Sequence, residues 1–203
     1  GMERDDGLAA AERAIALDEN LAEAHAAKAV VLTFSTQHEA ALVEIEKALR
    51  LDSESYEVNK AAARLFYTMR NHDAAIRHFE KAASSMETDY WASGMLNHCY
   101  TVSGDPESAR RAAQRTLART EKIIAQDPNN GSAMGFAIDA LSKLGEAERA
   151  KNLMNRALLL DPANMNMRYN MACTLIVDLH DVEAGLDLLE PLYREVSGSL
   201  LNW

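Results

Sequence analysis

Prolines, glycines and cysteines are few in this sequence, and long apolar runs are absent. Four prolines and nine glycines are spread over 203 residues, while alanine, leucine and glutamate are frequent; these are strong helix formers, so an all-α fold is expected. No run of about 18 apolar residues occurs, which excludes a transmembrane helix. Residues 1–6 lack the basic-then-apolar order of a secretory signal. The two cysteines, Cys99 and Cys173, lie far apart, which argues against a disulfide framework and favours a reducing cytoplasm.

Positive charge is also in short supply. The formal net charge is −10 and the isoelectric point is near 5.1. The longest basic cluster is Arg110-Arg111, and acidic and alanine residues surround it. A surface of this kind repels nucleic acid and anionic lipid, so we expect neither nucleic acid nor a membrane as a partner.

A period of 34 residues runs through the chain. One alanine column has spacings of 34, 34, 41 and 34 residues, and columns of larger side chains keep step with it, nine residues before and four residues after each alanine. Alternation of small and large side chains in a fixed register is what close helix packing requires. The alanine column is Ala41, Ala75, Ala109, Ala150 and Ala184; the column before it is Leu32, Phe66, Tyr100, Leu141 and Leu175.

Several segments resemble the second helix and exit turn of a tetratricopeptide repeat. The clearest is residues 145–164 (GEAERAKNLMNRALLLDPAN), and residues 43–52 (VEIEKALRLD) and 11–18 (AERAIALD) are similar. Asp105, followed by proline, is placed as a helix N-cap, and the Asp-Pro pairs at 127–128 and 161–162 should end helices. The resemblance implies an all-α, right-handed α-α superhelix of about 11–12 helices, with stacked hairpins that shield one another's apolar faces.

The period indicates that residues 1–203 form a single solenoid made of successive repeats. The expected repeats are a half repeat at 7–20, complete repeats at 22–55, 56–89, 90–130, 131–164 and 165–198, and a truncated end at 199–203. We therefore expect a fragment of a longer polypeptide. From Tyr169 onward the chain resembles the terminal module of bacterial multidomain proteins, which join such repeats to a class III nucleotide cyclase or to a DNA-binding regulator.

Two places depart from the period. The third repeat is seven residues too long, which is nearly two helical turns and keeps the apolar face on its original side. This predicts one long helix from near Pro106 to about Ala125, either a tolerated extension or a ledge on which a partner docks. Pro191 stands where alanine is expected, so the last helix should end or kink near Leu189, with Pro191 beginning a short final helix.

Candidate partner-binding residues follow from the resemblance, because in this family the first helix of each repeat lines a concave groove that holds a peptide. Trp91 and Tyr169 are the strongest candidates, since large amphipathic rings dominate binding hot spots; the alternative for both is packing against the next repeat. Ala26 and Val30 occupy the first-repeat places where some members clamp a carboxylate, which disfavours that mode. The full set is Lys60, Arg64, Tyr67, Trp91, Met95, His98, Phe136, Asp139, Asn166, Tyr169 and Asn170.

No pattern for catalysis or metal binding stands out. The sequence contains no phosphate-binding loop, nucleophile elbow or dinucleotide fingerprint, and no His-x3-His pair has a carboxylate beside it. Met165, Met167, Met171 and Cys173 suit a soft metal by type, but they fall in the helical register and are interpreted as core packing. We expect no enzyme activity, no cofactor and no metal in this chain.

These patterns lead to three functional hypotheses. The first is a cytoplasmic scaffold that binds a protein or peptide partner in its groove, within a larger bacterial signalling or regulatory protein. The second is a regulatory arm of a nucleotide cyclase or transcriptional regulator in the same chain. The third is a self-association module that forms a homodimer through uncovered end helices.

Overall fold

The structure is a computed structural model that describes residues 2–200. Within that range it contains eleven α-helices, one π-helical segment and no strand, which confirms the all-α class. The chain divides into two compact units, with the boundary between Ala109 and Arg110.

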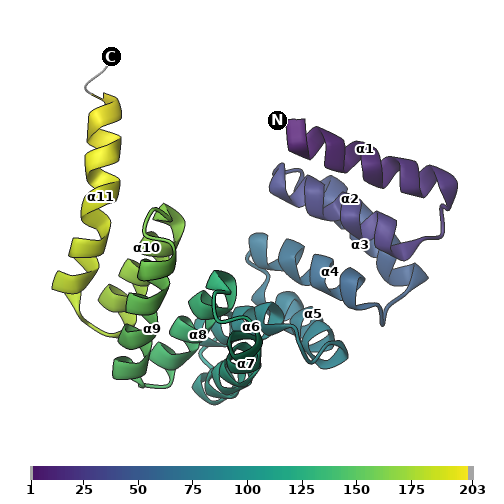
Figure 1. Ribbon diagram of the computed structural model, residues 1–203. Coiled ribbons are helices and arrows are strands. Elements are labelled where there is room, and N and C mark those ends of the chain that lie inside the picture. The colour runs from purple at the N-terminus through teal and green to yellow at the C-terminus, as the bar shows by residue number, and fades with distance from the viewer. Residues whose placement is uncertain (1, 201–203) are drawn as a thin grey trace. The chain divides into compact units, whose positions relative to one another are not determined.

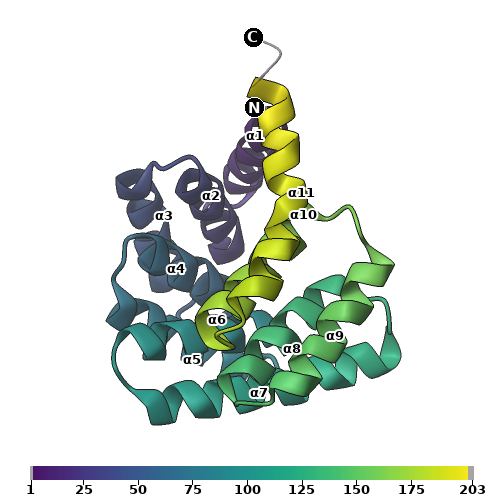
Figure 2. The same cartoon turned by 90° about the vertical axis from the view of Figure 1, so that its left-hand side faces the viewer.

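Unit 1 is a stack of antiparallel helix pairs (Figures 1 and 2). Helices α2 and α3 form one pair and α4 and α5 the next, while α1 packs on α2 and α6 packs on α5. The first helix begins before the half repeat expected at residues 7–20 and ends three residues earlier than that range. The helices are α1 (Met2–Leu17), α2 (Ala22–Phe34), α3 (His38–Leu51), α4 (Tyr56–Thr68), α5 (His72–Ser85) and α6 (Tyr90–Val102).

The alanine column lies in the core of unit 1. Ala41 and Ala75 are fully buried, as are Ile45 and Phe79 four residues after each of them. The small side chains let neighbouring helices approach closely and the large ones fill the remaining space. The register read from the sequence therefore matches the packing of these helices.

A partly buried network of polar side chains joins α2 to α3. The carboxylate of Glu44 lies 2.6 Å from Nδ1 of His25 and 2.9 Å from Nζ of Lys28. Burial raises the pKa of Glu44, but the hydrogen bonds from His25 and Lys28 outweigh it, and the pKa lies below its usual value. The ionised carboxylate is thus favoured in the folded protein.

The turn inside each hairpin has the same backbone conformation. One residue in each turn has a positive φ. In the first four turns the next N–H donates to a carbonyl five residues earlier, as in a Schellman motif; in the last turn the Asp181 N–H donates to the Leu175 carbonyl, six residues earlier. This conformation is strained for residues other than glycine. The residues are Thr36, Arg70, Gly104, Gly145 and His180, with φ between 55° and 79°.

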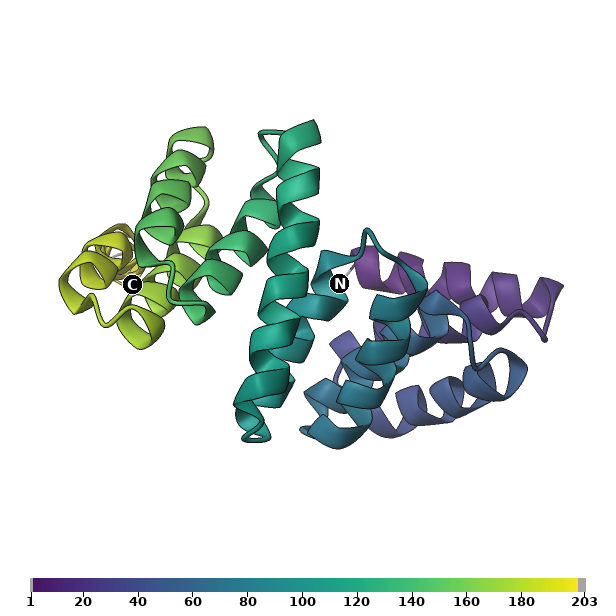
Figure 3. The same cartoon turned by 90° about the horizontal axis from the view of Figure 1, so that it is seen from below.

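Helix α7 (Pro106–Gln126) begins in unit 1 and continues through unit 2. It has 21 residues, which confirms the long helix expected from the insertion, and Figure 3 shows it along its length. The Asp105 carboxylate accepts a hydrogen bond from the Ser108 N–H at 3.0 Å, so the predicted N-cap is present. The helix ends directly before Asp127-Pro128, as predicted.

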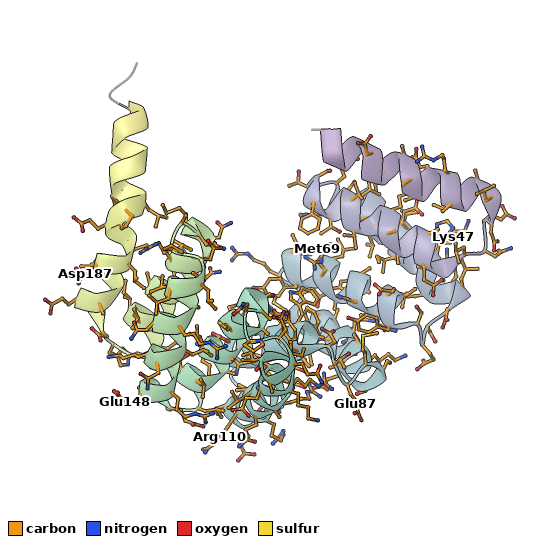
Figure 4. All side chains as sticks on the ribbon, in the orientation of Figure 1. Lys47, Met69, Glu87, Arg110, Glu148 and Asp187 are labelled. Carbon is orange, nitrogen blue, oxygen red and sulfur yellow. The ribbon has the colours of Figure 1, made fainter. Side chains whose placement is uncertain are left out.

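Unit 2 continues with antiparallel pairs. Helices α8 and α9 pack together, as do α10 and α11, and α10 also contacts α8. Figure 4 shows side chains filling the space between these helices; Met134, Ile138 and Met171 are among the buried ones. The remaining elements are α8 (Gly131–Lys143), α9 (Ala147–Leu160), α10 (Met165–Cys173), the π-helical segment η1 (Thr174–Asp178) and α11 (Val182–Leu200).

The prediction that Pro191 begins a separate final helix was wrong. Helix α11 neither ends near Leu189 nor starts again at Pro191; it passes through the proline as one element. Proline removes the hydrogen bond to the carbonyl four residues earlier, and that carbonyl belongs to Asp187, an exposed residue, where water can replace the lost donor.

Helix α11 also approaches the preceding element closely. A Cβ added at Gly185 would lie 2.4 Å from Cγ1 of Ile176 and 3.1 Å from the carbonyl oxygen of Ala172. The glycine therefore permits the contact between α11 and the α10–η1 segment.

Candidate functional site

Two cations and three aromatic rings meet on α2, α4 and α6 of unit 1. Lys60 and Arg64 lie four residues apart on α4, so they share one face of the helix. The guanidinium carbon of Arg64 is 4.4 Å from the centroid of the Trp91 ring and 5.0 Å from that of the Phe34 ring. Together with Tyr56, these residues are called the cation–aromatic surface.

Lys60 contacts two of the aromatic residues of this surface, Tyr56 and Trp91. Its Nζ donates a hydrogen bond to the Tyr56 hydroxyl at 2.8 Å and lies 5.7 Å from the centroid of the Trp91 ring. Burial, followed by a hydrogen bond with Asp89 and that residue's charge, raises the pKa of Tyr56. The phenol therefore remains protonated and links the ammonium group of Lys60 to the buried carboxylate of Asp89.

Asp89 also fixes the position of Trp91. Its Oδ1 accepts the Trp91 N–H at 2.9 Å and the Ala92 N–H at 3.4 Å, which caps α6 at its N-terminus. The Trp91 ring then packs edge-to-face on the fully buried ring of Phe79, with 5.4 Å between centroids. Trp91 therefore packs on the core and also stacks with the half-buried cation of Arg64; its role in binding a partner stays a prediction.

Arg64 is a half-buried cation without an acidic partner. Burial lowers its pKa, and no carboxylate among residues 6–193 lies within ion-pair distance of it. Its charge is offset only by the faces of the Phe34 and Trp91 rings, which stabilise a cation by about 0.5–2 kcal/mol. A guanidinium held in this way presents its remaining N–H donors to an anion.

A second ring cluster lies on the neighbouring part of unit 1. Tyr67 contacts His98 edge-on, with centroids 5.6 Å apart, and His72 at 6.1 Å. Burial raises the pKa of Tyr67. His98 is exposed and Met95 is half-buried, both on α6. Six of the eleven candidate residues thus lie on α4 and α6 of unit 1.

The other five candidates belong to unit 2. Tyr169 is 53% exposed, and Asn166 and Asn170 are exposed beside it on α10, while Phe136 is half-buried on α8. Asp139, also on α8, has a raised pKa because of burial; Lys143 lowers the pKa and Asp178 raises it. Their role in binding stays a prediction.

The sequence analysis misses two residues of the cation–aromatic surface, Phe34 and Tyr56, and also Asp89, which supports it. Phe34 is the last residue of α2 and is 53% exposed, so a register drawn from groove positions leaves it out. Tyr56 is the first residue of α4, and Asp89 directly precedes α6. Asp89 carries a usable signal, because an aspartate directly before a helical apolar run is a typical N-cap.

In the part of the chain that the structure describes, two kinds of feature are absent. No group of three or more histidine, cysteine, aspartate or glutamate side chains is arranged to hold a metal ion there. In the same range, no helix has both the length and the hydropathy needed to cross a membrane.

Comparison with known proteins supports the fold read from the repeats. Residues 139–164 match a model of the tetratricopeptide repeat. No curated protein matches the sequence significantly. The chain has the tetratricopeptide-repeat fold, as its structural neighbours show.

Three solved structures illustrate this likeness. PilF of Pseudomonas aeruginosa is 20% identical with a TM-score of 0.66, over 98% of this chain and 86% of the other. YrrB, described as a TPR protein with an unusual peptide-binding site, is 22% identical with a TM-score of 0.58, over 89% of each chain. Human IFIT1, solved as a dimer with m7Gppp-AAAA, is 14% identical with a TM-score of 0.67, over 92% of this chain and 45% of the other. At these identities the likeness extends to the fold alone.

Proposed function

We propose that unit 1 binds an acidic segment of a partner protein on the cation–aromatic surface. The observation that carries this proposal is Arg64, which is stacked between Phe34 and Trp91 and lacks a carboxylate partner among the described residues. In a chain of net charge −10, acidic side chains are abundant, so an arginine left without one is best explained by an anionic group supplied from outside.

The surrounding groups favour a protein ligand. Arginine, tryptophan and tyrosine are the residue types that dominate protein-binding hot spots. Their rings are held by the core and by a helix cap, so little side-chain entropy is lost when a partner binds. The fold is shared with YrrB, whose description names a peptide-binding site. These features support a preformed surface for an extended or helical segment with an acidic residue beside an apolar anchor.

A peptide-display selection tests this function. A library of random peptides is selected on the wild-type protein and, in parallel, on the Arg64→Gln variant. We expect wild type to enrich peptides that contain Asp or Glu next to an apolar residue, and the variant to lose that enrichment. Arg77→Gln is the matched control, because Arg77 is exposed on α5 and the net charge changes equally. Enrichment of basic peptides, or an identical outcome for wild type and Arg64→Gln, overturns the proposal.

The wider setting is a hypothesis that the resemblance from Tyr169 onward supports. In it, the chain acts in the cytoplasm as the binding arm of a larger bacterial signalling or regulatory protein. Determining the gene sequence that flanks this segment tests the hypothesis: a nucleotide cyclase or DNA-binding domain in the same reading frame is expected, and a parent protein with neither would contradict it.

A further inference from the structure

A groove opens between α7 and α9 in unit 2, separate from the cation–aromatic surface. It is open to solvent and has a volume of about 570 Å³, which lies within the range of about 300–1,000 Å³ that is typical of small-ligand pockets. Its lining is mostly apolar, with charged side chains at the edge. The lining residues are Leu117, Glu121, Ile124, Ala125, Pro128, Ala137, Leu141, Arg149, Asn152, Leu153 and Arg156.

The seven-residue insertion supplies one wall of this groove. Helix α7 has 21 residues and α9 has 14, a difference of seven. Glu121, Ile124 and Ala125 lie in the last two turns of α7, and Pro128 follows directly after them. A helix of ordinary length would stop before these residues, so the groove depends on the extension.

The groove combines an apolar floor with one uncompensated cation. Leu117 and Leu141 are buried, and Ile124 and Leu153 are half-buried. At the edge, Arg149 pairs with Glu121 at 2.5 Å and also with Glu146.

Arg156, two turns further along α9, differs from Arg149. Its guanidinium donates a hydrogen bond to the carbonyl oxygen of Pro128, and no carboxylate lies within ion-pair distance among the residues whose side chains the structure describes. A carbonyl group is neutral, so no described carboxylate neutralises Arg156, and because the side chain is exposed its other N–H donors are open to a ligand.

We propose that the α7–α9 groove binds a small amphipathic carboxylate, whose apolar body fills the space between the helices and whose anionic end pairs with Arg156. The volume suits a small molecule, the floor suits an aryl or branched aliphatic group, and a guanidinium pairs with a carboxylate through two parallel hydrogen bonds. The site lies wholly within unit 2 and does not depend on the function proposed for unit 1.

The proposal is tested by following the chemical shifts of the backbone amides by NMR while a small carboxylic acid is added. Phenylbutyrate is titrated into the protein, with its uncharged amide as a second probe. We expect saturable shifts of α7 and α9 resonances with the acid, and binding that is about tenfold weaker with the amide or with Arg156→Gln.

Two tryptophan variants of α7 locate the binding. Ala125 is exposed and lines the groove, whereas Ala118 is exposed on α7 outside it. Ala125→Trp should block the shifts, and Ala118→Trp should leave them unchanged, while both keep wild-type helicity by circular dichroism. Absence of saturable shifts at α7 and α9, equal binding of acid and amide, or full binding by Ala125→Trp overturns the proposal.

Discussion

The hairpin turns provide a measurable test of how the repeat folds. The same turn position, with positive φ, holds glycine at Gly104 and Gly145 but threonine at Thr36. Because the backbone conformation is shared, the identity of the residue should set the local strain. Gly145→Ala should therefore destabilise unit 2, and Thr36→Gly should stabilise unit 1.

The magnitude follows from the surroundings of these residues. A Cβ added at Gly145 meets nothing within 4 Å, so its cost arises from the backbone alone. Placing an L-residue in the left-handed region costs about 1–2 kcal/mol, while removing a glycine from the unfolded chain returns about 0.4–1 kcal/mol. Gly145→Ala should then lower the free energy of unfolding by about 1 kcal/mol, and Thr36→Gly should raise it by about 0.5–1 kcal/mol.

Urea unfolding followed by circular dichroism measures both changes, with hydrogen exchange used to assign each change to its unit. Gly131→Ala is the control, because its added Cβ also meets open space but the backbone has no positive φ; it should be neutral or slightly stabilising. A neutral Gly145→Ala, or a destabilising Thr36→Gly, would refute the reasoning from backbone strain.

Three further predictions concern close packing, pH and stacking. Gly185→Ala should destabilise unit 2 by about 1–3 kcal/mol, because its Cβ would meet a side chain at 2.4 Å. Gly135→Ala, whose Cβ would lie in open space within α8, should instead stabilise unit 2 by up to about 1 kcal/mol. Melting temperatures that shift in the same direction for both variants would count against this prediction. The folded pKa of Glu44 lies below its usual value, so its ionised form adds stability above the unfolded pKa of about 4.3, and that stability is lost as pH falls through the folded pKa. Glu44→Gln should flatten this acid limb in a plot of urea midpoint against pH, and an unaltered slope would be inconsistent with the network. A double-mutant cycle with Arg64→Met and Trp91→Leu should give a coupling of about 0.5–2 kcal/mol, and a coupling near zero would show that the ring and the cation do not interact.

Much of the helical framework could be predicted because it follows from local chemistry and from a repeated register. The seven-residue insertion predicts the long helix that begins at Pro106, because an insertion of that length keeps the apolar face on the same side. Its start at Asp105 and its end before Asp127 follow from capping and from the restriction that proline places on the preceding residue. Each of these signals lies within a few residues of the feature that it determines.

Pro191 shows where local rules stop. The cost of a proline within a helix depends on whether the carbonyl that loses its donor can find another, and that depends on exposure. Asp187 is exposed in the structure, and this exposure cannot be predicted from the local sequence. The two-unit division is likewise a property of packing that a single repeat register does not contain.

The sequence predicts which helix face carries the candidate residues, but not which of their side chains touch. The register placed Lys60, Arg64 and Trp91 on first helices, and the structure brings their side chains together. The stacking of Arg64 on Phe34 joins residues of different repeats, so it depends on how α2 and α4 cross. Asp89, which orders the surface through a helix cap, was left out because the register considers only residues within helices.

The affinity of a selected acidic peptide for three proteins tests the central claim most directly. Isothermal titration of the peptide compares wild type with Arg64→Gln and Arg77→Gln at one salt concentration. If Arg64 pairs with an acidic side chain of the partner, its variant should bind about tenfold more weakly or worse, since hydrogen bonds to charged groups contribute about 1.5–3 kcal/mol, and Arg77→Gln should bind like wild type. Equal affinity of all three proteins, or an equal loss in both variants, would contradict the assignment of the binding surface.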